Sequence, residues 1–289
     1  MVGKRKKTDL MIDGLIYLLL GLLSLITLLP FLQVITISFS PSSEVLKYGF
    51  KLFPTKIDLS GYIRVFQNGL IWNSYLNTII RTLAGTSLSV LLTVLGAYPL
   101  SKKYLPNRKL RTGLIVFTMY FSGGLIPLYI LVNNLGLRDT LGALILPGAI
   151  CAFTLIVARN FFMTIPESLE ESARIDGAND IYILFKIIIP LSLPILATIS
   201  LWYGVNHWNS WFDNMLYMKT QEKFVLQYVL RMILMEGTAF TSGVEVTSFV
   251  NSDTMKMATL VVSTVPIIMV YPFLQKYFVK GLLIGSVKG

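Results

Sequence analysis

The chain has 289 residues, of which 54% are hydrophobic and only 14% are charged, whereas soluble domains carry about 25% charged residues. The mean hydropathy of +0.67 and the long apolar runs predict an all-α membrane protein built as one helical bundle rather than a set of soluble domains. The net charge of +10 would suit a nucleic-acid-binding protein, but basic residues in short loops between apolar runs explain it better, so we expect no nucleic-acid partner.

Six apolar runs are long enough to cross a bilayer, since a helix needs about 20 apolar residues to span the hydrocarbon core. We expect transmembrane helices at residues 14–38, 75–100, 113–132, 141–162, 187–205 and 257–278. The basic segment at residues 1–13 followed by an apolar run could indicate a signal peptide, but the run is too long and no small-residue cleavage motif follows it. We therefore expect residues 14–289 to form a single transmembrane domain.

Loop charges predict the orientation. The segments at residues 1–13 and 101–112 are short and rich in Lys and Arg, so the positive-inside rule places them in the cytoplasm. Six spans then leave both termini cytoplasmic, with a short tail at residues 279–289. The longer polar segments at residues 39–74 and 206–256 become external loops.

Several residues inside the spans suggest local roles. Arg81, near the outer end of the second span, is expected to extend to the interface. Cys151, the only cysteine, is expected to be a buried structural thiol. The adjacent glycines Gly123 and Gly124 are expected to allow close helix approach, and Pro190 and Pro194 to break the fifth span.

A polar segment at residues 166–186 separates the fourth and fifth spans. It places five acidic residues within fourteen positions: Glu167, Glu170, Glu171, Asp176 and Asp180. Ser168 and Glu171 have the spacing of a capping box, which predicts a short helix from Leu169 to Ile175. Gly177 suits a chain reversal because glycine adopts positive φ without steric cost.

A second short helix is expected directly after this reversal. Asn179 can cap it, and Ile181, Leu184 and Phe185 would share one of its faces. The segment therefore predicts a helix–turn–helix hairpin outside the bilayer. Its acidic residues do not suggest a metal site, because no His or Cys accompanies them.

Motifs for catalysis and energy supply are missing from the sequence. No G-x-x-x-x-G-K-[ST] loop is present to bind ATP phosphates, and the only histidine, His207, has no partners that suggest a catalytic or zinc set. No series of ionisable residues runs through the spans, as in many proton-driven carriers. We therefore expect a protein that is not an enzyme and binds no cofactor, so that transport is either passive or driven by another chain.

The polar hairpin resembles the "EAA" coupling loop of permease subunits in ATP-binding-cassette (ABC) importers. The resemblance is carried by Glu171, Ser172, Ala173, Asp176, Gly177, Ala178, Phe185, Ile188, Pro190, Leu191 and Pro194, with Ser172 in place of the usual Ala. It implies the type I importer permease fold, in which this loop is a cytoplasmic coupling helix that docks into a cleft of an ATPase subunit. The coupling residues that it implies are Glu170, Glu171, Ser172, Ala173, Asp176, Gly177 and Ala178.

The resemblance extends over nearly the whole chain and is closest to carbohydrate importers of the maltose type, in the branch that includes alginate and pectin-fragment importers. The motifs at residues 121–127, 144–148 and 207–212 and the tail from Phe278 also carry it. The tail is implied to make a second ATPase contact through Lys280, Gly281, Gly285 and Lys288. The substrate implied is an oligosaccharide, and the location is the bacterial cell membrane with its lipid.

The partners that this resemblance implies are a second homologous six-span permease, two ATPase subunits that use ATP and Mg²⁺, and an extracytoplasmic sugar-binding protein. The permease itself would be non-catalytic and would work by alternating access. Two other classes stay open. One is a permease of an ABC importer for another solute, and the other is an autonomous channel or secondary carrier.

An aromatic and amide cluster follows the fifth span. Aromatic faces pack on sugar rings and amides bind sugar hydroxyls, so the candidate substrate residues are Asn206, Trp208, Asn209 and Trp211. An interfacial aromatic belt in contact with lipid would place Trp at the same depth. Contact with the external binding protein is a third interpretation.

Overall fold

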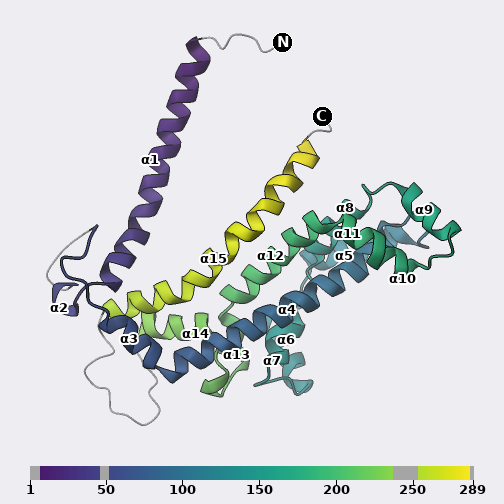
Figure 1. Ribbon diagram of the computed structural model, residues 1–289. Helices are drawn as coiled ribbons and strands as arrows, with labels where there is room; N and C mark the ends of the chain where they lie inside the picture. The colour runs from purple at the N-terminus through teal and green to yellow at the C-terminus, as the bar shows by residue number, and fades with distance from the viewer. Residues whose placement is uncertain (1–6, 46–51, 237–252, 287–289) are drawn as a thin grey trace. The chain divides into compact units, whose positions relative to one another are not determined.

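The computed structural model describes residues 7–45, 52–236 and 253–286, and in these residues the secondary structure is helical, without a strand (Figure 1). The all-α class expected from the sequence is therefore confirmed for the described part of the chain. The chain divides into two compact units, Met1–Gly69 with Met232–Thr264 and Leu70–Arg231 with Val265–Gly289. Each unit is described here by itself.

The first unit contains the most apolar of the three long helices that could cross a membrane by themselves. Its elements are α1 (Lys7–Ser38), α2 (Ser42–Val45), α3 (Ser60–Gln67), the π-helical turn Met232–Glu236 and the start of α15 (Asp253–Ser286). In α1, the segment Met11–Ser38 contains an 18-residue stretch with a mean hydropathy of 2.5. The Ser24 hydroxyl donates to the Leu20 carbonyl at 2.8 Å, so this polar group is satisfied inside the helix, as a bilayer requires.

Helix α3 is held against the end of α1. Ser38 Oγ and Tyr62 Oη are hydrogen-bonded at 2.8 Å, and the Phe39 and Tyr62 rings lie 4.8 Å apart. At Gly61 a Cβ atom would come within 3.1 Å of the Thr254 side chain, so glycine permits close approach there. Part of the segment expected as an external loop is therefore an ordered helix.

The second unit holds most of the helices. Its elements are α4 (Gly69–Ser101), α5 (Arg108–Tyr120), α6 (Leu125–Asn134), α7 (Leu141–Ile145), α8 (Ala152–Phe162), α9 (Glu167–Ile175), α10 (Asp180–Ile183), α11 (Ile189–Leu191), α12 (Leu193–Asn209), α13 (Phe212–Tyr217) and α14 (Leu226–Arg231). Two 3-10 turns at Leu146–Gly148 and Gln221–Lys223 and a π-helical turn at Leu184–Ile188 complete it.

Helix α4 buries a stripe of small and hydroxyl-bearing residues. Every third or fourth position is buried along this helix: Ile71, Ser74, Thr78, Arg81, Gly85, Ser89, Thr93 and Ala97. Small side chains allow neighbouring helices to approach closely. At Gly85 a Cβ atom would lie only 2.5 Å from His207 Nε2 of α12, so the two helices can pass at this distance only because residue 85 is glycine.

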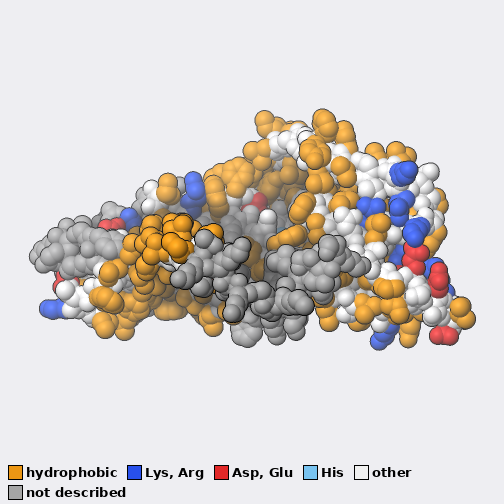
Figure 2. All heavy atoms as spheres, turned by 90° about the horizontal axis from the view of Figure 1, so that it is seen from above, with side chains coloured by type: hydrophobic (Ala, Val, Ile, Leu, Met, Phe, Trp, Pro, Cys, Tyr) orange, Lys and Arg blue, Asp and Glu red, His pale blue; other side chains and the backbone are white. Residues whose placement is uncertain are grey.

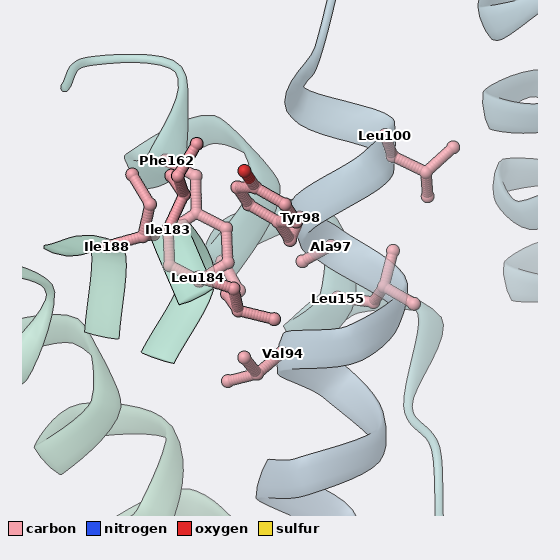
Figure 3. Close-up of a cluster of buried hydrophobic side chains, with 10 residues drawn as sticks. Val94, Ala97, Tyr98, Leu100, Leu155, Phe162, Ile183, Leu184 and Ile188 are labelled. Carbon is pink, nitrogen blue, oxygen red and sulfur yellow. The ribbon is translucent and has the colours of Figure 1, made fainter. Parts of the chain in front are cut away.

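A hydrophobic core joins the end of α4 to α8 and to the segment after α10 (Figure 3). Its buried members are Val94, Ala97, Tyr98, Leu100, Leu155, Ala158, Phe162, Ile183, Leu184 and Ile188. Figure 3 shows Ile183, Leu184 and Ile188 facing the α4 side chains Val94 and Tyr98. The base of the polar hairpin is therefore packed against the end of α4.

Three of the expected spans are bent helix pairs rather than straight helices. The bends measure 107° between α5 and α6, 53° before α8, and 84° between Asp180–Leu191 and α12. Among the described residues, three helices are long and apolar enough to cross a membrane, or up to six if each bent pair is one span. The break expected in the fifth span is confirmed, at Ser192 between α11 and α12.

Gly124, the second glycine of the pair in the third expected span, has a different role from the one predicted. Gly124 has φ +86°, in the region that favours glycine, and nothing lies within 4 Å of its Cβ position. The expectation of close helix approach was therefore wrong for this residue. It allows the chain to leave the helical conformation between α5 and α6.

Two further residues differ from the expectation. Arg81 does not extend to an interface; its side chain is 2% exposed and pairs with Asp213 inside the second unit. Cys151 is exposed rather than buried; it lies in the bend immediately before α8, where it is the N-cap residue.

Helix boundaries also depart from the expected ones. α1 begins at Lys7 and α4 at Gly69, before the expected residues 14 and 75. α15 continues to Ser286 and takes in most of the expected tail. The segment expected as the loop 206–256 contains the end of α12 and the helices α13 and α14, while residues 237–252 lie outside the described residues.

Candidate functional site

The polar segment between α8 and α12 is a helix–turn–helix hairpin, as predicted. At the end of α9, the Ala178 amide donates to the Ala173 carbonyl at 2.9 Å and the Gly177 amide to the Arg174 carbonyl at 3.0 Å. Gly177 has φ +84°. This is the Schellman arrangement, in which a left-handed glycine satisfies the last carbonyls of a helix. Asn179 caps α10, since its Oδ1 accepts from the Tyr182 amide at 2.8 Å.

Two details of the predicted hairpin were wrong. α9 begins at Glu167 directly after Pro166, and its N-cap has no side-chain hydrogen bond, so the Ser168–Glu171 capping box does not form. The helix starts before Ser168 because Pro166 is the N-cap residue, with φ −58° and ψ 128°. In the second arm, Leu184 is buried, whereas Ile181 and Phe185 are exposed, so the three side chains expected on one face have different environments.

The predicted coupling residues fall into three environments. Glu171, Ser172, Asp176 and Gly177 are exposed on the hairpin. Ala173 and Ala178 are half-buried against the hydrophobic core. Glu170 is buried and forms an ion pair with Lys102. A hollow of about 540 Å³ lies along the hairpin, lined by Ala173, Asp176, Gly177, Ala178, Asn179, Tyr182, Lys186 and Ile187.

Charged residues attach α9 to the chain that follows α4. The buried Lys102–Glu170 pair lies beside Tyr98, whose ring centroid is 4.4 Å from Lys102 Nζ. An exposed pair, Lys103–Glu167, adds a second contact at 3.0 Å. These two pairs bring residues 102–103 and 167–170 together, which sequence reasoning did not predict.

The two arms of the hairpin are also joined to each other. Arg174 Nη2 donates to Asp180 Oδ1 at 2.9 Å and to the Tyr104 hydroxyl at 2.7 Å. The hydrogen bond to the Asp180 carboxylate raises the pKa of the Arg174 guanidinium above its ordinary value. The hairpin is therefore closed by charge–charge hydrogen bonds as well as by its turn.

Large apolar side chains project from this polar hairpin. Ile175 is 86% exposed and Ile181 is 69% exposed. Figure 2 shows Lys, Arg, Asp and Glu side chains gathered at the end that α9 and α10 form. An apolar centre with a polar rim is the usual composition of a protein–protein interface. Sequence reasoning missed the exposure of both residues; the available signal was an isoleucine directly before the Asp-Gly turn and another two residues after the helix cap Asn179.

The candidate sugar residues do not share one environment. Trp208 is 8% exposed, with its ring edge-on to Tyr75 at 6.0 Å, whereas Asn206 and Asn209 are exposed. Trp211 is half-buried, and the guanidinium of Arg231 lies 3.9 Å from its ring centroid. Only Trp211 among the aromatic candidates therefore combines accessible surface with a cation.

The tail residues are placed only in part. Lys280, Gly281 and Gly285 lie within α15, where the side chains are not described. Lys288 lies outside the described residues.

Comparisons with known proteins show which proteins this chain resembles in sequence and in structure. The chain is 46% identical over 280 residues to the polygalacturonan/rhamnogalacturonan transport system permease protein YtcP of Bacillus subtilis, covering 96% of this chain and 98% of that protein. It superposes with a TM-score of 0.88 on a chain from a bacterial ABC transporter involved in the import of the acidic polysaccharide alginate, with 36% identity and coverage of 95% and 99% of the two chains.

A second solved structure shares the fold alone. It is a bacterial alginate ABC transporter in complex with an alginate pentasaccharide-bound periplasmic protein, and the matched chain is 16% identical with a TM-score of 0.56, covering 94% of this chain and 96% of that chain. A search against protein-family models found no match.

Apolar helices able to cross a bilayer, together with a polar hairpin after α8, define a helical membrane protein. With the similarity in sequence and structure over nearly its whole length, the chain belongs to the permease subunits of carbohydrate ABC importers. It is a protein of the bacterial cell membrane.

Proposed function

We propose that this chain is one of two six-span subunits that form the translocation pathway of an ATP-driven importer for oligosaccharides derived from acidic polysaccharides. The relatives that support this substrate class transport polygalacturonan or alginate, both of which are polymers of sugar acids. The chain is not a catalyst, and two separate ATPase subunits hydrolyse ATP with Mg²⁺.

The geometry of the α9–α10 hairpin is the observation that carries this proposal. It ends in a glycine turn with φ +84°, exposes Glu171 and Asp176, and adds the apolar side chain of Ile175 at 86% exposure. A surface with an apolar residue ringed by charged and polar groups suits docking to a protein better than contact with anionic lipid. The partner of this surface is an ATPase subunit, and the hairpin docks into a cleft of that subunit.

The bent helix pairs supply the remaining spans. Counting each pair once gives six spans, and the basic loop at residues 101–112 then lies in the cytoplasm with both termini and the hairpin. The tail residues Lys280, Gly281, Gly285 and Lys288 make a second contact with the ATPases.

Transport follows alternating access. ATP binding closes the two ATPase subunits and draws the two hairpins of the subunit pair together. This movement opens the pathway toward the outside, where a sugar-loaded binding protein releases its oligosaccharide. Hydrolysis returns the pathway to the cytoplasm-facing state. The energetic requirement is that the ATPase dimer binds one state of the permease more tightly than the other.

The substrate contact is assigned to the end of α12 and the start of α13. Trp211 offers an aromatic face, and Arg231 holds a guanidinium 3.9 Å from the ring centroid. A sugar acid presents an apolar ring face and a carboxylate, which suit an aromatic ring and a guanidinium respectively. Asn206 and Asn209 are exposed near this position and can bind sugar hydroxyls.

The test is mild purification of the tagged chain from its native membrane, followed by identification of the proteins that accompany it. A second six-span chain and an ATPase with a phosphate-binding loop are expected. The complex, reconstituted with its binding protein, should hydrolyse ATP faster when oligogalacturonate is added. A homo-oligomer that moves solute without ATP would overturn the proposal and would favour an autonomous carrier. If another solute stimulated ATP hydrolysis and oligogalacturonate did not, the oligosaccharide substrate would be rejected.

A further inference from the structure

We propose that the buried Lys102–Glu170 ion pair is the joint through which movement of the hairpin is transmitted to α4. This inference rests on the proposed function, because it assigns a mechanical role within the coupling of ATP hydrolysis to transport. Lys102 and Glu170 are positioning residues, since neither reaches the surface that would contact the ATPase.

Burial distinguishes this pair from an ordinary surface contact. Lys102 is 9% exposed and Glu170 is 6% exposed, and the ring of Tyr98 covers the ammonium with its centroid 4.4 Å away. A buried charge that loses its partner is strongly unfavourable, whereas an exposed pair contributes little. The two elements are therefore expected to separate only with difficulty and to move together.

The hydrophobic core makes the same connection through the second arm of the hairpin. Ile183, Leu184 and Ile188 pack with Tyr98 of α4 (Figure 3). The ring face of Tyr98 also covers Lys102, the residue that pairs with Glu170 of α9. α9 and the segment after α10 are consequently fixed to the same end of α4.

The last turn of α4 needs this support. Pro99 lies inside the helix, two residues before its end at Ser101, and proline removes one intrahelical hydrogen bond and favours a kink. A displacement of the hairpin could therefore be absorbed by bending at Pro99. The ion pair and the Tyr98 contacts oppose that bending and allow the displacement to reach the rest of the helix.

The part of α4 around Arg81, far from the hairpin, is also held in place. Arg81, buried in α4, donates to the carbonyls of Leu144 and Ser210 at 3.2 Å each and pairs with Asp213. From Arg81 to Ser101 an α-helix extends about 30 Å. α4 therefore links the hairpin to the segment between α12 and α13, which contains the proposed sugar contact Trp211.

The first test removes both charges of the joint together. In Lys102→Met with Glu170→Gln no buried charge is left unpaired, so the chain should fold and assemble with the ATPases. Oligogalacturonate-stimulated ATP hydrolysis by the reconstituted complex should fall about tenfold, within the range of typical coupling free energies, while unstimulated hydrolysis persists. The chain supplies a matched control in Lys103→Met with Glu167→Gln, which removes the neighbouring exposed pair, 75% and 61% exposed, and should leave stimulation unchanged.

A second measurement restores the joint covalently. Lys102→Cys with Glu170→Cys, in a Cys151→Ser background that removes the native exposed thiol, should be uncoupled until a short bifunctional thiol reagent bridges the two cysteines. Bridging should restore stimulation, and reduction should abolish it again. A neutral pair that remains fully stimulated, or a bridged pair that stays uncoupled, would overturn the inference. Failure of the unmodified complex to bind an ATPase or respond to oligosaccharide would instead reject the proposed function.

Discussion

Arg81 and Asp213 are 132 residues apart in the sequence, yet their side chains form an ion pair inside the second unit, with Arg81 Nη1 3.3 Å from Asp213 Oδ1. The Asp213 carboxylate also accepts from the Ser210 hydroxyl and the Asn214 amide, both at 2.9 Å. The arginine adds hydrogen bonds to two backbone carbonyls. This arrangement joins α4, α7 and the start of α13.

Arg81→Ala should therefore destabilise the protein. It leaves the Asp213 carboxylate without its cation, and breaking a buried pair in this way typically costs about 3–5 kcal/mol. The thermal unfolding midpoint in detergent should fall well below that of the unchanged protein. Arg81→Lys keeps the charge but cannot donate to three partners in the fork geometry of a guanidinium, so its midpoint should be intermediate. Equal midpoints for Arg81→Ala and the unchanged chain would contradict the assignment.

Two substitutions of Gly177 separate the effect of backbone strain from the effect of side-chain size on the hairpin surface. Nothing lies within 4 Å of a Cβ atom at this position, but φ is +84°, so Gly177→Ala should cost about 1–2 kcal/mol through the backbone alone. Gly177→Arg adds a large side chain to the hairpin surface and should abolish sugar-stimulated ATP hydrolysis in the reconstituted complex.

The control is Gly113→Ala in α5, where a Cβ atom also meets nothing within 4 Å and the backbone is helical. This change should be neutral or slightly stabilising. Normal stimulation in the Gly177→Arg complex would refute the docking role of the turn.

Gly85 provides a test of helix packing. In Gly85→Ala the new Cβ atom would lie 2.5 Å from His207 Nε2, and such overpacking costs about 1–3 kcal/mol. Because the buried imidazole ring is the obstacle, His207→Ala should relieve the clash. A double-mutant cycle on unfolding midpoints should show strong coupling between the two changes. Additive effects would show that α4 and α12 do not approach closely there.

The two tryptophans near the end of α12 should behave differently. Trp208 is buried against Tyr75, so Trp208→Ala should mainly lower stability, by about 3–5 kcal/mol for loss of a large buried aromatic side chain. Arg231→Gln leaves Trp211 in place but removes the nearby guanidinium. It should raise the KM for oligogalacturonate uptake with little change in the unfolding midpoint. The sugar-binding role predicted for Trp208 would regain support if Trp208→Ala lost uptake at normal stability.

Asp139 should make stability depend on acid pH. The Thr220 hydroxyl, the Lys219 and Thr220 amides and the Lys223 ammonium donate to its carboxylate, and they hold the pKa of Asp139 well below its usual value. A carboxyl group with a lowered folded-state pKa stabilises the protein above its unfolded pKa of about 3.9. That contribution is lost as the pH falls from there through the folded-state pKa.

Asp139→Asn is the matching variant, because Asn tolerates the positive φ of 60° observed at this position. It should be less stable than the unchanged protein at pH 7, and its unfolding midpoint should change less between pH 5 and pH 3. Lys223→Gln should have a smaller effect, since Lys223 is half-exposed and exposed ion pairs contribute little. Identical pH profiles would contradict the role of this carboxylate.

Sequence reasoning located the hairpin correctly because its features are local. The Gly177 turn and the Asn179 cap depend on residues within a few positions of each other. It failed at the start of α9, where both Pro166 and Ser168 are candidates for the N-cap position. The structure has Pro166 as the N-cap residue. Sequence reasoning also failed to see that Glu170 faces inward, because its partner Lys102 is 68 residues away.

The amino-acid sequence by itself determined the helical membrane class of the protein and the place of the polar hairpin. Apolar runs of about 20 residues must cross a bilayer or be buried, and a charged hairpin between them must lie outside it. Only the tertiary structure decided how the buried charged residues of the second unit are paired. Arg81 turns inward to Asp213, and Lys102 to Glu170, because a buried charge requires a partner and that partner can come from any distant helix that packs nearby.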